Sequence, residues 1–538
     1  MSKKKIIVRG PAMSLSGYGE QCRFALRALR EYDEIYDIYL TNIPWGQTGF
    51  ITEDTEERRW LDSLLKKTIE YMQSAGKVDI DQHGVQQNGQ SAATFDMSLQ
   101  VTIPNEFEQL APINVGYTAG IETDKISPEW LEKTFLMDRI VVVSEHAKYG
   151  FDNTEYPAQN SITGEVVVMS CKKPVIPVGY PVRHFEPDQS LQEEMDFEHD
   201  FNFLTMAQWG VRKNLENTIR WFVDEFKDDN VGLVVKTFQR CNSTIDRTFT
   251  AERLRSLVGE DPNRKCKIYF LHGSMTNSEL SALYAHEKIK ALINLSHGEG
   301  FGLPMFEATS HELPVIAPAW SGHCDFLYGP VANKKTKKVK TRPLFARVDY
   351  TIGNVQKQAV WAGVINEDAK WCYPTEDSYK KTLRKVYKQY DRYKGMSKKL
   401  KKHITETFTE ERQYKMFAEA VMGEEINEEE VIREYMGKYD NIIYKKLDSD
   451  PGIYGTWNEA LKLATGEYIT NANLDDRKAP WSLERHAMEL YVNNTVDLVY
   501  ADSFITNQPN ETYEQNSSSG RRYNFEQFSK EALLRGNQ

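Results

Sequence analysis

The stretch that decides the fold runs from Asn294 to Asp325 and reads NLSHGEGFGLPMFEATSHELPVIAPAWSGHCD. An apolar run at residues 289–295 (IKALINL) leads into it and predicts a buried parallel strand. A glycine-bearing turn follows, and Pro304 suits the first turn of a helix. The apolar residues 313–317 predict the next strand. In a strand–turn–helix–strand unit of this kind, glycines allow backbone N–H groups and a helix N-terminus to contact an anion.

Two carboxylates belong to this unit. Glu299 lies in the predicted turn, and Glu307 lies about one turn into the predicted helix. Both can therefore face one crevice at the carboxyl end of the strand, which is where ligands bind in open α/β sheets. The alternative is a plain crossover whose two glutamates are solvated.

The bulk composition limits the classes of protein. A chain of 538 residues exceeds a single core and predicts about three or four domains. The net charge of −11 argues against general nucleic-acid binding as the main task. The sequence has no apolar run of about 18 residues and no signal-peptide pattern, so we expect a cytoplasmic protein without a membrane span. The six cysteines form no C-x-x-C pair and are expected to be reduced packing residues.

The string SHGEGFGLPMFEATSHELPVIAP (residues 296–318) resembles the E-x7-E signature of retaining GT-B glycosyltransferases, in particular family four. The resemblance implies two Rossmann-like domains that face a cleft, and transfer of a sugar from a nucleotide-diphosphate sugar with retention. Carried over by position, Glu299 lies against the transferred sugar, and Glu307 binds the two ribose hydroxyls. The resemblance further implies that the donor pocket is lined by Gly300, Phe301, Gly302 and Leu303. It implies no metal ion at this site.

A basic turn is predicted between a strand at residues 201–206 and a helix at residues 215–226. In the same family a Lys in this turn neutralises the donor diphosphate, and Lys213 occupies that position. The family usually has an Arg five residues earlier, where this chain has Gln208, so Arg212 would take over that role. Together with Glu299, these two cations form the candidate catalytic set, which would act by positioning and charge stabilisation. A solvated basic turn is the alternative.

The amino-terminal strand, at residues 5–9, leads through residues 10–19 into a helix predicted from Glu20 to Tyr32. This segment resembles the amino-terminal glycine loop of the same enzymes, and we therefore assign Gly17 and Gly19 to donor binding. A simple turn is the alternative. Further strands are predicted at residues 35–40, 97–102 and 140–143, and Ser144 is predicted to cap the helix that follows the last of them.

Several polar or aromatic residues receive no catalytic role. Glu122 lies where some relatives place an acidic cleft residue, and we interpret it as a loop carboxylate. Tyr284 is interpreted as a core contact of a helix at residues 277–286. We interpret His297, His311 and His323 as structural polar contacts. The basic run at residues 333–340 is expected to be a solvated loop, with binding of an anionic acceptor as the alternative.

The predicted domain boundaries follow from these patterns. Residues 1–182 form an N-terminal Rossmann-like, acceptor-side domain, and residues 183–422 form a C-terminal Rossmann-like donor-binding domain. A long helical region at residues 376–422 is expected to cross back and brace the N-terminal domain. Residues 423–538 form a third part, so the fold class is α/β: GT-B plus a C-terminal partial GT-A module.

The third part resembles the middle of an inverting GT-A glycosyltransferase of family two, on residues 441–445, 450–458 and 468–477. In that family the acidic end of a strand holds Mg²⁺ or Mn²⁺, because hard cations prefer carboxylate oxygens. Asn473 replaces the first acid here, which leaves Asp475 as the metal ligand and Asp476 beside it. The opening nucleotide-binding strand and the segment with the catalytic base are missing, so we expect an inactive partial module or a truncated reading frame.

The resulting hypothesis is a hexosyltransferase-like enzyme of carbohydrate biosynthesis. Its donor is a nucleotide-diphosphate sugar, and its acceptor is a glycan, lipid, protein or nucleic acid. Two rival hypotheses stay open. One is a phosphorylase or synthase on the same fold, and the other is a nucleotide-sugar-binding or scaffold protein without transferase activity. The sequence specifies neither the sugar, the base, the acceptor nor the oligomeric state.

Overall fold

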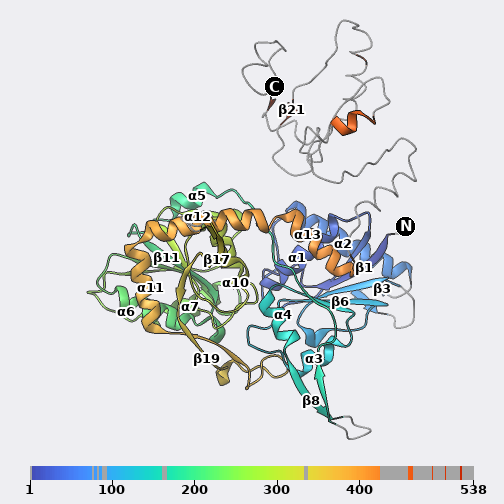
Figure 1. Cartoon of the computed structure of the whole chain (residues 1–538), viewed down its shortest axis with the longest axis horizontal. Coiled ribbons are helices and arrows are strands. Elements are labelled where there is room, and N and C mark those ends of the chain that lie inside the picture. Colours follow the sequence, from blue (N-terminus) through green and yellow to red (C-terminus); the bar gives the residue numbers. More distant parts are fainter. Residues whose placement is uncertain are drawn as a thin grey trace. The chain divides into compact units, whose positions relative to one another are not determined.

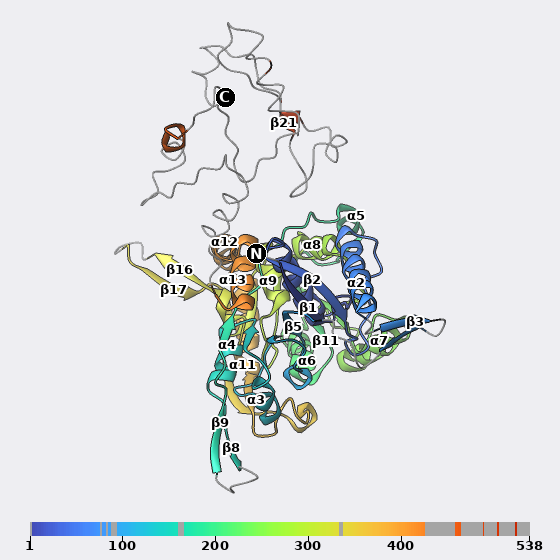
Figure 2. The same cartoon turned by 90° about the vertical axis from the view of Figure 1, so that its right-hand side faces the viewer.

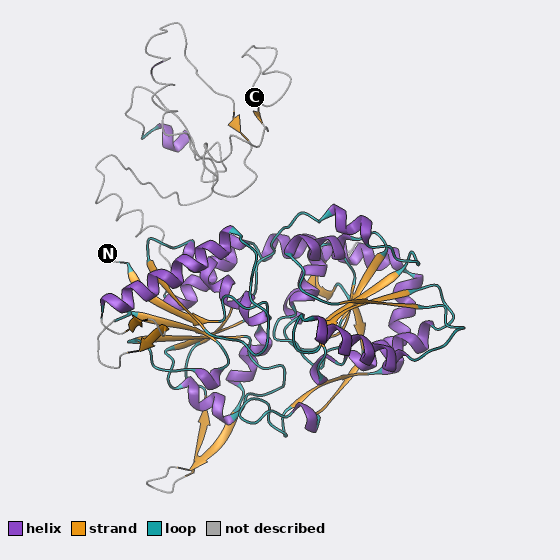
Figure 3. Cartoon of the chain, turned by 180° about the vertical axis from the view of Figure 1, so that it is seen from behind, coloured by secondary structure: helices purple, strands orange, loops and turns teal. Residues whose placement is uncertain are grey.

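The computed structural model describes residues 3–75, 78–81, 84–87, 94–159, 166–332, 337–424, 458–463, 488, 503–504 and 522–523. The chain separates into two compact units, Met1–Ile426 and Asn427–Gln538. Within the first unit, helices cover both faces of two parallel sheets (Figures 1 and 3). Each sheet with its helices is called a half of this unit below.

The sheet of the first half has six parallel strands in the order β10-β7-β6-β5-β1-β2. The strands are β1 (Lys4–Gly10), β2 (Tyr36–Asn42), β5 (Met97–Val101), β6 (Ile113–Thr118), β7 (Arg139–Val142) and β10 (Val175–Pro177). The chain passes from β1 to β2 on one side and later to β5 on the other, which creates a switch point where ligands bind in such sheets. The sequence patterns did not predict β6, because Gly116 interrupts its apolar run. That glycine is needed because a Cβ there would lie 2.5 Å from the ring of Phe107.

The helices of the first half pack on both faces of this sheet, and their apolar sides form its core. They are α1 (Gly17–Arg30), α2 (Glu56–Ser74), α3 (Pro128–Thr134) and α4 (Glu145–Asp152), with a 3₁₀ turn, η1 (Pro104–Glu106). The predicted cap of α4 is confirmed, since the Ser144 side chain accepts a hydrogen bond from the amide of Ala147.

The first helix begins earlier than predicted. Ser16 is its N-cap and accepts from the amide of Gly19, so Gly17 and Gly19 lie in the first turn of α1 and not in a free glycine loop. A Cβ at Gly19 would lie 1.9 Å from the carbonyl oxygen of Ser14. The preceding loop therefore folds back onto the helix start, and this close approach accounts for the glycine.

The sheet of the second half also has six parallel strands, in the order β13-β12-β11-β14-β15-β18. Its strands are β11 (Asn202–Gln208), β12 (Gly232–Phe238), β13 (Lys267–Leu271), β14 (Ile289–Ile293), β15 (Val315–Pro318) and β18 (Ala346–Val348). Its helices are α5 (Gln189–Glu194), η2 (Val211–Lys213), α6 (Leu215–Phe226), α7 (Thr244–Val258), α8 (Asn277–Ala285), α9 (Leu303–Ser310) and α10 (Cys324–Leu327). The predicted strand–turn–helix–strand unit is confirmed as β14, α9 and β15. Two doubly wound parallel domains joined by crossing helices are the GT-B arrangement.

The helical region predicted at residues 376–422 consists of three helices, α11 (Glu376–Lys388), α12 (Tyr390–Thr407) and α13 (Glu410–Met422). Phe408 leaves the helical conformation, and Thr409 caps α13. Helix α13 packs against α1 of the first half (Figure 1). The Tyr36 hydroxyl donates to the carbonyl of Ala418 at 3.0 Å, and the Arg139 guanidinium donates to that of Val421 at 2.8 Å.

The two halves also carry antiparallel hairpins, several of which project from them (Figure 2). They are β3 (Val78–Asp81) with β4 (Gly84–Gln87), β8 (Glu155–Gln159) with β9 (Val166–Ser170), β16 (Tyr328–Ala332) with β17 (Val339–Pro343), and β19 (Tyr350–Asn354) with β20 (Lys370–Pro374); a 3₁₀ turn, η3 (Lys357–Ala359), lies inside the last. The loop prediction for residues 333–340 is wrong at its end, because Val339 and Lys340 begin β17. Residues 333–336 lie outside the described part of the chain.

In the second unit the structure describes a helical turn at residues 458–463 and the antiparallel pair β21 (Ser503–Phe504) and β22 (Arg522–Tyr523). The predicted metal ligands Asp475 and Asp476, with Asn473 and the strands predicted around them, lie outside the described residues. Among the helices that the structure describes, none is both long and apolar enough to cross a membrane.

Candidate functional site

The basic turn and the glycine turn lie side by side because β11 and β14 are adjacent parallel strands. The chain leaves the carboxyl end of β11 into η2 and leaves the carboxyl end of β14 into residues 294–302. The two turns are hydrogen-bonded to each other, since the amide of His297 donates to the carbonyl of Arg212 at 2.8 Å. Asn214 closes the basic turn in the left-handed conformation, with φ of 50°, and its side-chain amide donates to the carbonyl of Leu295 at 3.2 Å.

Glu299 is the centre of the site and is only 5% exposed. Lys213 Nζ lies 2.6 Å from its Oε1 and 2.7 Å from its Oε2, and Arg212 Nη1 lies 3.2 Å from Oε2. Ser296 Oγ and Asn294 Nδ2 also donate to Oε1, at 2.7 and 3.1 Å. Burial alone would raise the pKa of Glu299, but Lys213 and Arg212 outweigh it and hold the pKa well below its usual range. Glu299 is therefore an ionised carboxylate, and both of its oxygens accept hydrogen bonds.

The two cations differ in their surroundings. Burial and the neighbouring Arg212 lower the pKa of Lys213, and Glu299 opposes that shift. Burial would lower the pKa of Arg212, but Glu122 and Glu299 raise it. Arg212 Nη1 also donates to the carbonyl of Gly298 at 2.8 Å. The predicted set Glu299, Lys213 and Arg212 is thus brought together by direct contacts.

Glu122 belongs to the same cluster, which corrects its interpretation as an ordinary loop carboxylate. Its Oε1 lies 3.2 Å from Arg212 Nη1. It comes from the loop that follows β6 in the first half, so the ion pair joins the two halves. The signal that could have found it is its position just past a strand end of the first sheet, but β6 was not predicted.

The glycines of the turn make room for the backbone of the first half. A Cβ at Gly298 would lie 2.2 Å from the carbonyl oxygen of Glu122, and one at Gly300 would lie 2.6 Å from that of Ala119. Gly302 has φ of +97° and is the N-cap of α9. Two of these glycines are therefore explained by contact between the halves, and the third is explained by its backbone conformation.

Glu307 lies in α9 and is half-buried, with a different kind of partner. The Tyr284 hydroxyl on α8 donates to its Oε2 at 2.9 Å. Burial raises the pKa of Glu307 to about 7, against the effects of Tyr284 and Lys236. Lys236 itself is held by the carbonyl of Gly273, at 3.0 Å. Tyr284 is therefore more than the core contact that we predicted, because it orients a candidate site carboxylate.

The side chain of Phe301, a residue predicted to line the donor pocket, lies in the core. Its side chain is 4% exposed and packs in a cluster of aromatic rings, with centroids 5.0 Å from Tyr180, 5.2 Å from Phe306 and 5.0 Å from Phe326. Any contact between Phe301 and a donor must therefore use its backbone. Leu303, the first residue of α9, is half-buried.

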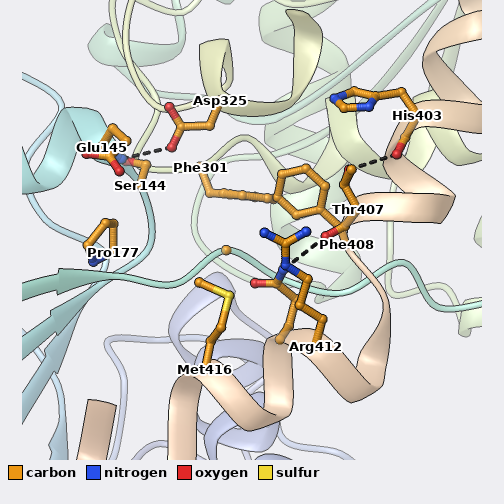
Figure 4. A pocket seen from close by; sticks show the side chains of 12 residues that line it. Ser144, Glu145, Pro177, Phe301, Asp325, His403, Thr407, Phe408, Arg412 and Met416 are labelled. Carbon is orange, nitrogen blue, oxygen red and sulfur yellow. Dashed lines mark hydrogen bonds between the residues drawn. The ribbon is translucent and has the colours of Figure 1, made fainter. Parts of the chain in front are cut away.

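A separate cavity of about 320 Å³ lies where α12 meets α13 (Figure 4). The ring of Phe301 faces it together with Phe408 and Arg412, whereas Glu299 and Lys213 do not line it. On its wall, the amide of Glu145 donates to Asp325 Oδ2 at 2.8 Å, so a carboxylate of the second half contacts the first turn of α4. Burial raises the pKa of Asp325 to about 6.

The three histidines near the site make structural contacts, as predicted. His297 Nδ1 lies 2.7 Å from the carbonyl of Cys372, and its ring stacks on Trp371. His323 Nε2 lies 2.7 Å from the carbonyl of Pro318, and His311 Nε2 lies 2.7 Å from Ser281 Oγ. Within the described ranges, no three His, Cys, Asp or Glu side chains form a group that could hold a metal ion.

Comparison with known proteins gives one family match and several similar structures. Residues 423–537 match the sequence model described as glycosyl transferase family 2. No curated protein matches the chain. The chain is similar in structure to sucrose-phosphate synthase from Thermosynechococcus elongatus, with 12% identity and a TM-score of 0.47 over 81% of this chain and 100% of that chain. It is also similar to Anabaena HepE in complex with UDP and glucose, with 11% identity and a TM-score of 0.46 over 78% of this chain and 100% of that chain. A glycosyltransferase from Rickettsia africae has 11% identity and a TM-score of 0.47 over 79% of this chain and 99% of that chain.

Proposed function

We propose that residues 1–426 form a glycosyltransferase that moves a sugar from a nucleotide-diphosphate sugar to an acceptor, with retention of configuration at the transferred carbon. The observation that carries this proposal is the contact of Lys213 and Arg212 with the buried carboxylate of Glu299 at the adjoining ends of β11 and β14. Two cations and a carboxylate at such a crevice suit a ligand that has both anionic and hydroxyl groups.

The two cations would act on the leaving diphosphate. As the bond between the sugar and the diphosphate breaks, negative charge grows on the phosphate oxygens, and fixed cations stabilise it. A charge-assisted hydrogen bond contributes about 1.5–3 kcal/mol. Glu299, which keeps Lys213 and Arg212 in place, is the carboxylate that would lie against the sugar.

Glu307 would bind the ribose of the donor. Tyr284 donates to its Oε2, which leaves Oε1 to accept from a hydroxyl. Two ribose hydroxyls are hydrogen-bond donors, and they favour the ionised form of the carboxylate over the neutral form. Donor binding would therefore be accompanied by ionisation of Glu307.

The match of residues 423–537 to glycosyl transferase family 2 supports the further proposal that this segment is a GT-A module. Asp475 and Asp476 would be its ligands for Mg²⁺ or Mn²⁺. Carboxylate oxygens suit such hard cations.

The experiment that tests the main proposal uses the full chain and a panel of UDP-, GDP- and ADP-linked hexoses. Thermal shift finds the donor, because a ligand that binds only the folded state raises its stability. Release of the nucleotide is then measured with glycan, lipid and peptide acceptors, and NMR of the product gives its anomeric configuration. Transfer with the configuration of the donor supports the proposal. Release that depends on added phosphate would instead indicate a phosphorylase, and binding of a donor that stays intact would indicate a binding protein.

A further inference from the structure

Arg212 has two carboxylate partners, one from each half of the first unit. Glu299 Oε2 and Glu122 Oε1 each lie 3.2 Å from its Nη1. The side chains of Arg212 and Glu122 are 28% and 20% exposed, whereas the side chain of Glu299, taken without its backbone, is 7% exposed. The ion pair with Glu122 is therefore the more accessible of the two to a ligand.

The site as described is electrically balanced. Lys213 and Arg212 carry two positive charges, and Glu299 and Glu122 carry two negative charges. Lys213 Nζ already donates hydrogen bonds to both carboxylate oxygens of Glu299. An incoming diphosphate therefore meets a neutral cluster, in which Glu122 lies beside Arg212 Nη1 and competes with the negative charge of the phosphates.

The backbone holds the Glu122 carboxylate within reach of Arg212. The carbonyl of Glu122 lies against Gly298 of the second half, where a Cβ would come within 2.2 Å. Two residues further on, the amide of Asp124 donates to the carbonyl of Lys370 at 2.9 Å, and the amide of Lys370 donates to Asp124 Oδ1 at 2.7 Å. The loop is thus fixed to the second half at Glu122 and at Asp124, which limits the entropy lost when the pair forms.

We propose that Glu122 is a positioning residue that competes with the donor's diphosphate for the guanidinium of Arg212. Without a ligand, Glu122 holds Arg212 across the two halves. When a diphosphate binds, its oxygens replace the Glu122 carboxylate on Arg212. After transfer, the carboxylate takes Arg212 back and speeds release of the nucleoside diphosphate. This inference rests on the proposed function of the site.

Elementary electrostatics gives the direction and size of the effect. Removal of the Glu122 charge leaves the cluster with a net charge of +1 and ends the competition, so that diphosphate binds more tightly. Partly exposed charges a few ångströms apart interact through a high effective dielectric and are screened by salt. We expect the dissociation constant of a nucleoside diphosphate to fall roughly tenfold at low salt, and by less at high salt.

The test measures binding to the full-length chain by isothermal titration calorimetry, with UDP, GDP, ADP and inorganic pyrophosphate as probes. Glu122→Gln keeps the size of the side chain and removes its charge. The matched control is Glu132→Gln, an exposed acid in the same half whose loss changes the net charge equally. We expect tighter binding and slower release, measured by stopped flow, for Glu122→Gln alone. In the double variant Glu122→Gln/Arg212→Gln, the gain should disappear.

The outcomes separate this inference from the proposed function. Damage to the fold weakens binding, so a gain in affinity at an unchanged unfolding temperature supports competition. If the wild-type chain binds a probe and Glu122→Gln binds it equally or more weakly, the competition is refuted while the donor site stands. A gain that persists without Arg212 also refutes it. If no probe binds any variant, the proposed donor site and this inference both fail.

Discussion

Lys213 Nζ lies within hydrogen-bonding distance of both carboxylate oxygens of Glu299, at 2.6 and 2.7 Å, although 86 positions separate the two residues in the chain. The contact exists because β11 and β14 are neighbours in the sheet and the turns at their carboxyl ends meet. It connects a buried carboxylate to the cation that would face the donor diphosphate.

The first prediction concerns that cation. Lys213→Ala should lower kcat about 10- to 100-fold, because one charge-assisted hydrogen bond to the leaving group is lost. Arg212 and two neutral donors still contact Glu299, so the variant should remain folded. Turnover at saturating donor is the measurement, with the unfolding temperature as the check on folding. Lys381→Ala, which removes an exposed lysine on α11, is the control, and equal turnover of the two variants would contradict the role of Lys213.

The second prediction concerns the pH dependence of donor binding. Burial raises the pKa of Glu307 to about 7, and the nearby charged groups are Glu20 of α1 and Lys236 of β12. The ribose hydroxyls need the ionised carboxylate, so nucleoside diphosphate binding should strengthen as the pH rises from 6 to 8. In Glu307→Gln, binding should be weaker and this part of the pH dependence should be absent. Titration calorimetry of both proteins at each pH separates the pH dependence due to Glu307 from that due to ionisation of the phosphate, because the phosphate ionises in both cases. If the dissociation constant changed with pH equally in both proteins, the ribose contact would be disproved.

The third prediction concerns stability at the same residue. Because the folded-state pKa of Glu307 lies above its ordinary value of 4.5, the protonated side chain is favoured by the fold. This contribution is fully present below pH 4.5 and is lost as the pH rises toward about 7. Without ligand, the unfolding temperature of Glu307→Gln should therefore rise relative to that of the wild type as the pH increases from 5 to about 7.5. Thermal unfolding followed by circular dichroism checks the sign, and a constant difference across that range would argue against the raised pKa.

The fourth prediction uses two glycines near the site. Gly298→Ala would bring a Cβ to 2.2 Å from the carbonyl of Glu122, so the two halves must move apart. We expect a loss of about 1–3 kcal/mol of unfolding free energy. Gly210→Ala is the matched variant, because its Cβ would meet nothing within 4 Å and its φ is −149°. Denaturant unfolding of both variants should show the loss only at Gly298.

The fifth prediction concerns the left-handed residue of the basic turn. Asn214 has φ of 50°, a conformation that costs roughly 1–2 kcal/mol for a residue with a Cβ and no local hydrogen bond. Asn214→Ala should also lose the bond to the carbonyl of Leu295. Asn214→Gly should retain the turn and lose only the side-chain hydrogen bonds, to Leu295 and from Asn217, so it should be the more stable of the two in denaturant unfolding. The reverse order would show that the conformation of this turn is not a source of strain.

Local sequence patterns were sufficient to predict much of the secondary structure of the second half. The apolar run before Asn294 and the position of Pro304 predicted β14 and α9, because burial and backbone geometry are read over a few neighbouring residues. The family resemblance of this stretch pointed to Glu299, and that of the basic turn pointed to Lys213 and Arg212, which the structure brings into contact with it. Ser144 was predicted as a cap for the same local reason.

Tertiary structure decided the features that depend on segments distant in the chain. The strand β6 is interrupted in sequence by Gly116, and only the ring of Phe107 against it explains that glycine. Tyr284 and Phe301 are both aromatic, yet the hydroxyl of Tyr284 orients Glu307, whereas the ring of Phe301 packs in the core. Glu122 meets Arg212 only when the two halves come together. The sequence alone thus determined the local elements and the chemical types at the site, whereas the partners of each charge were decided by packing, because electrostatic pairing depends on distance in space and not on separation along the chain.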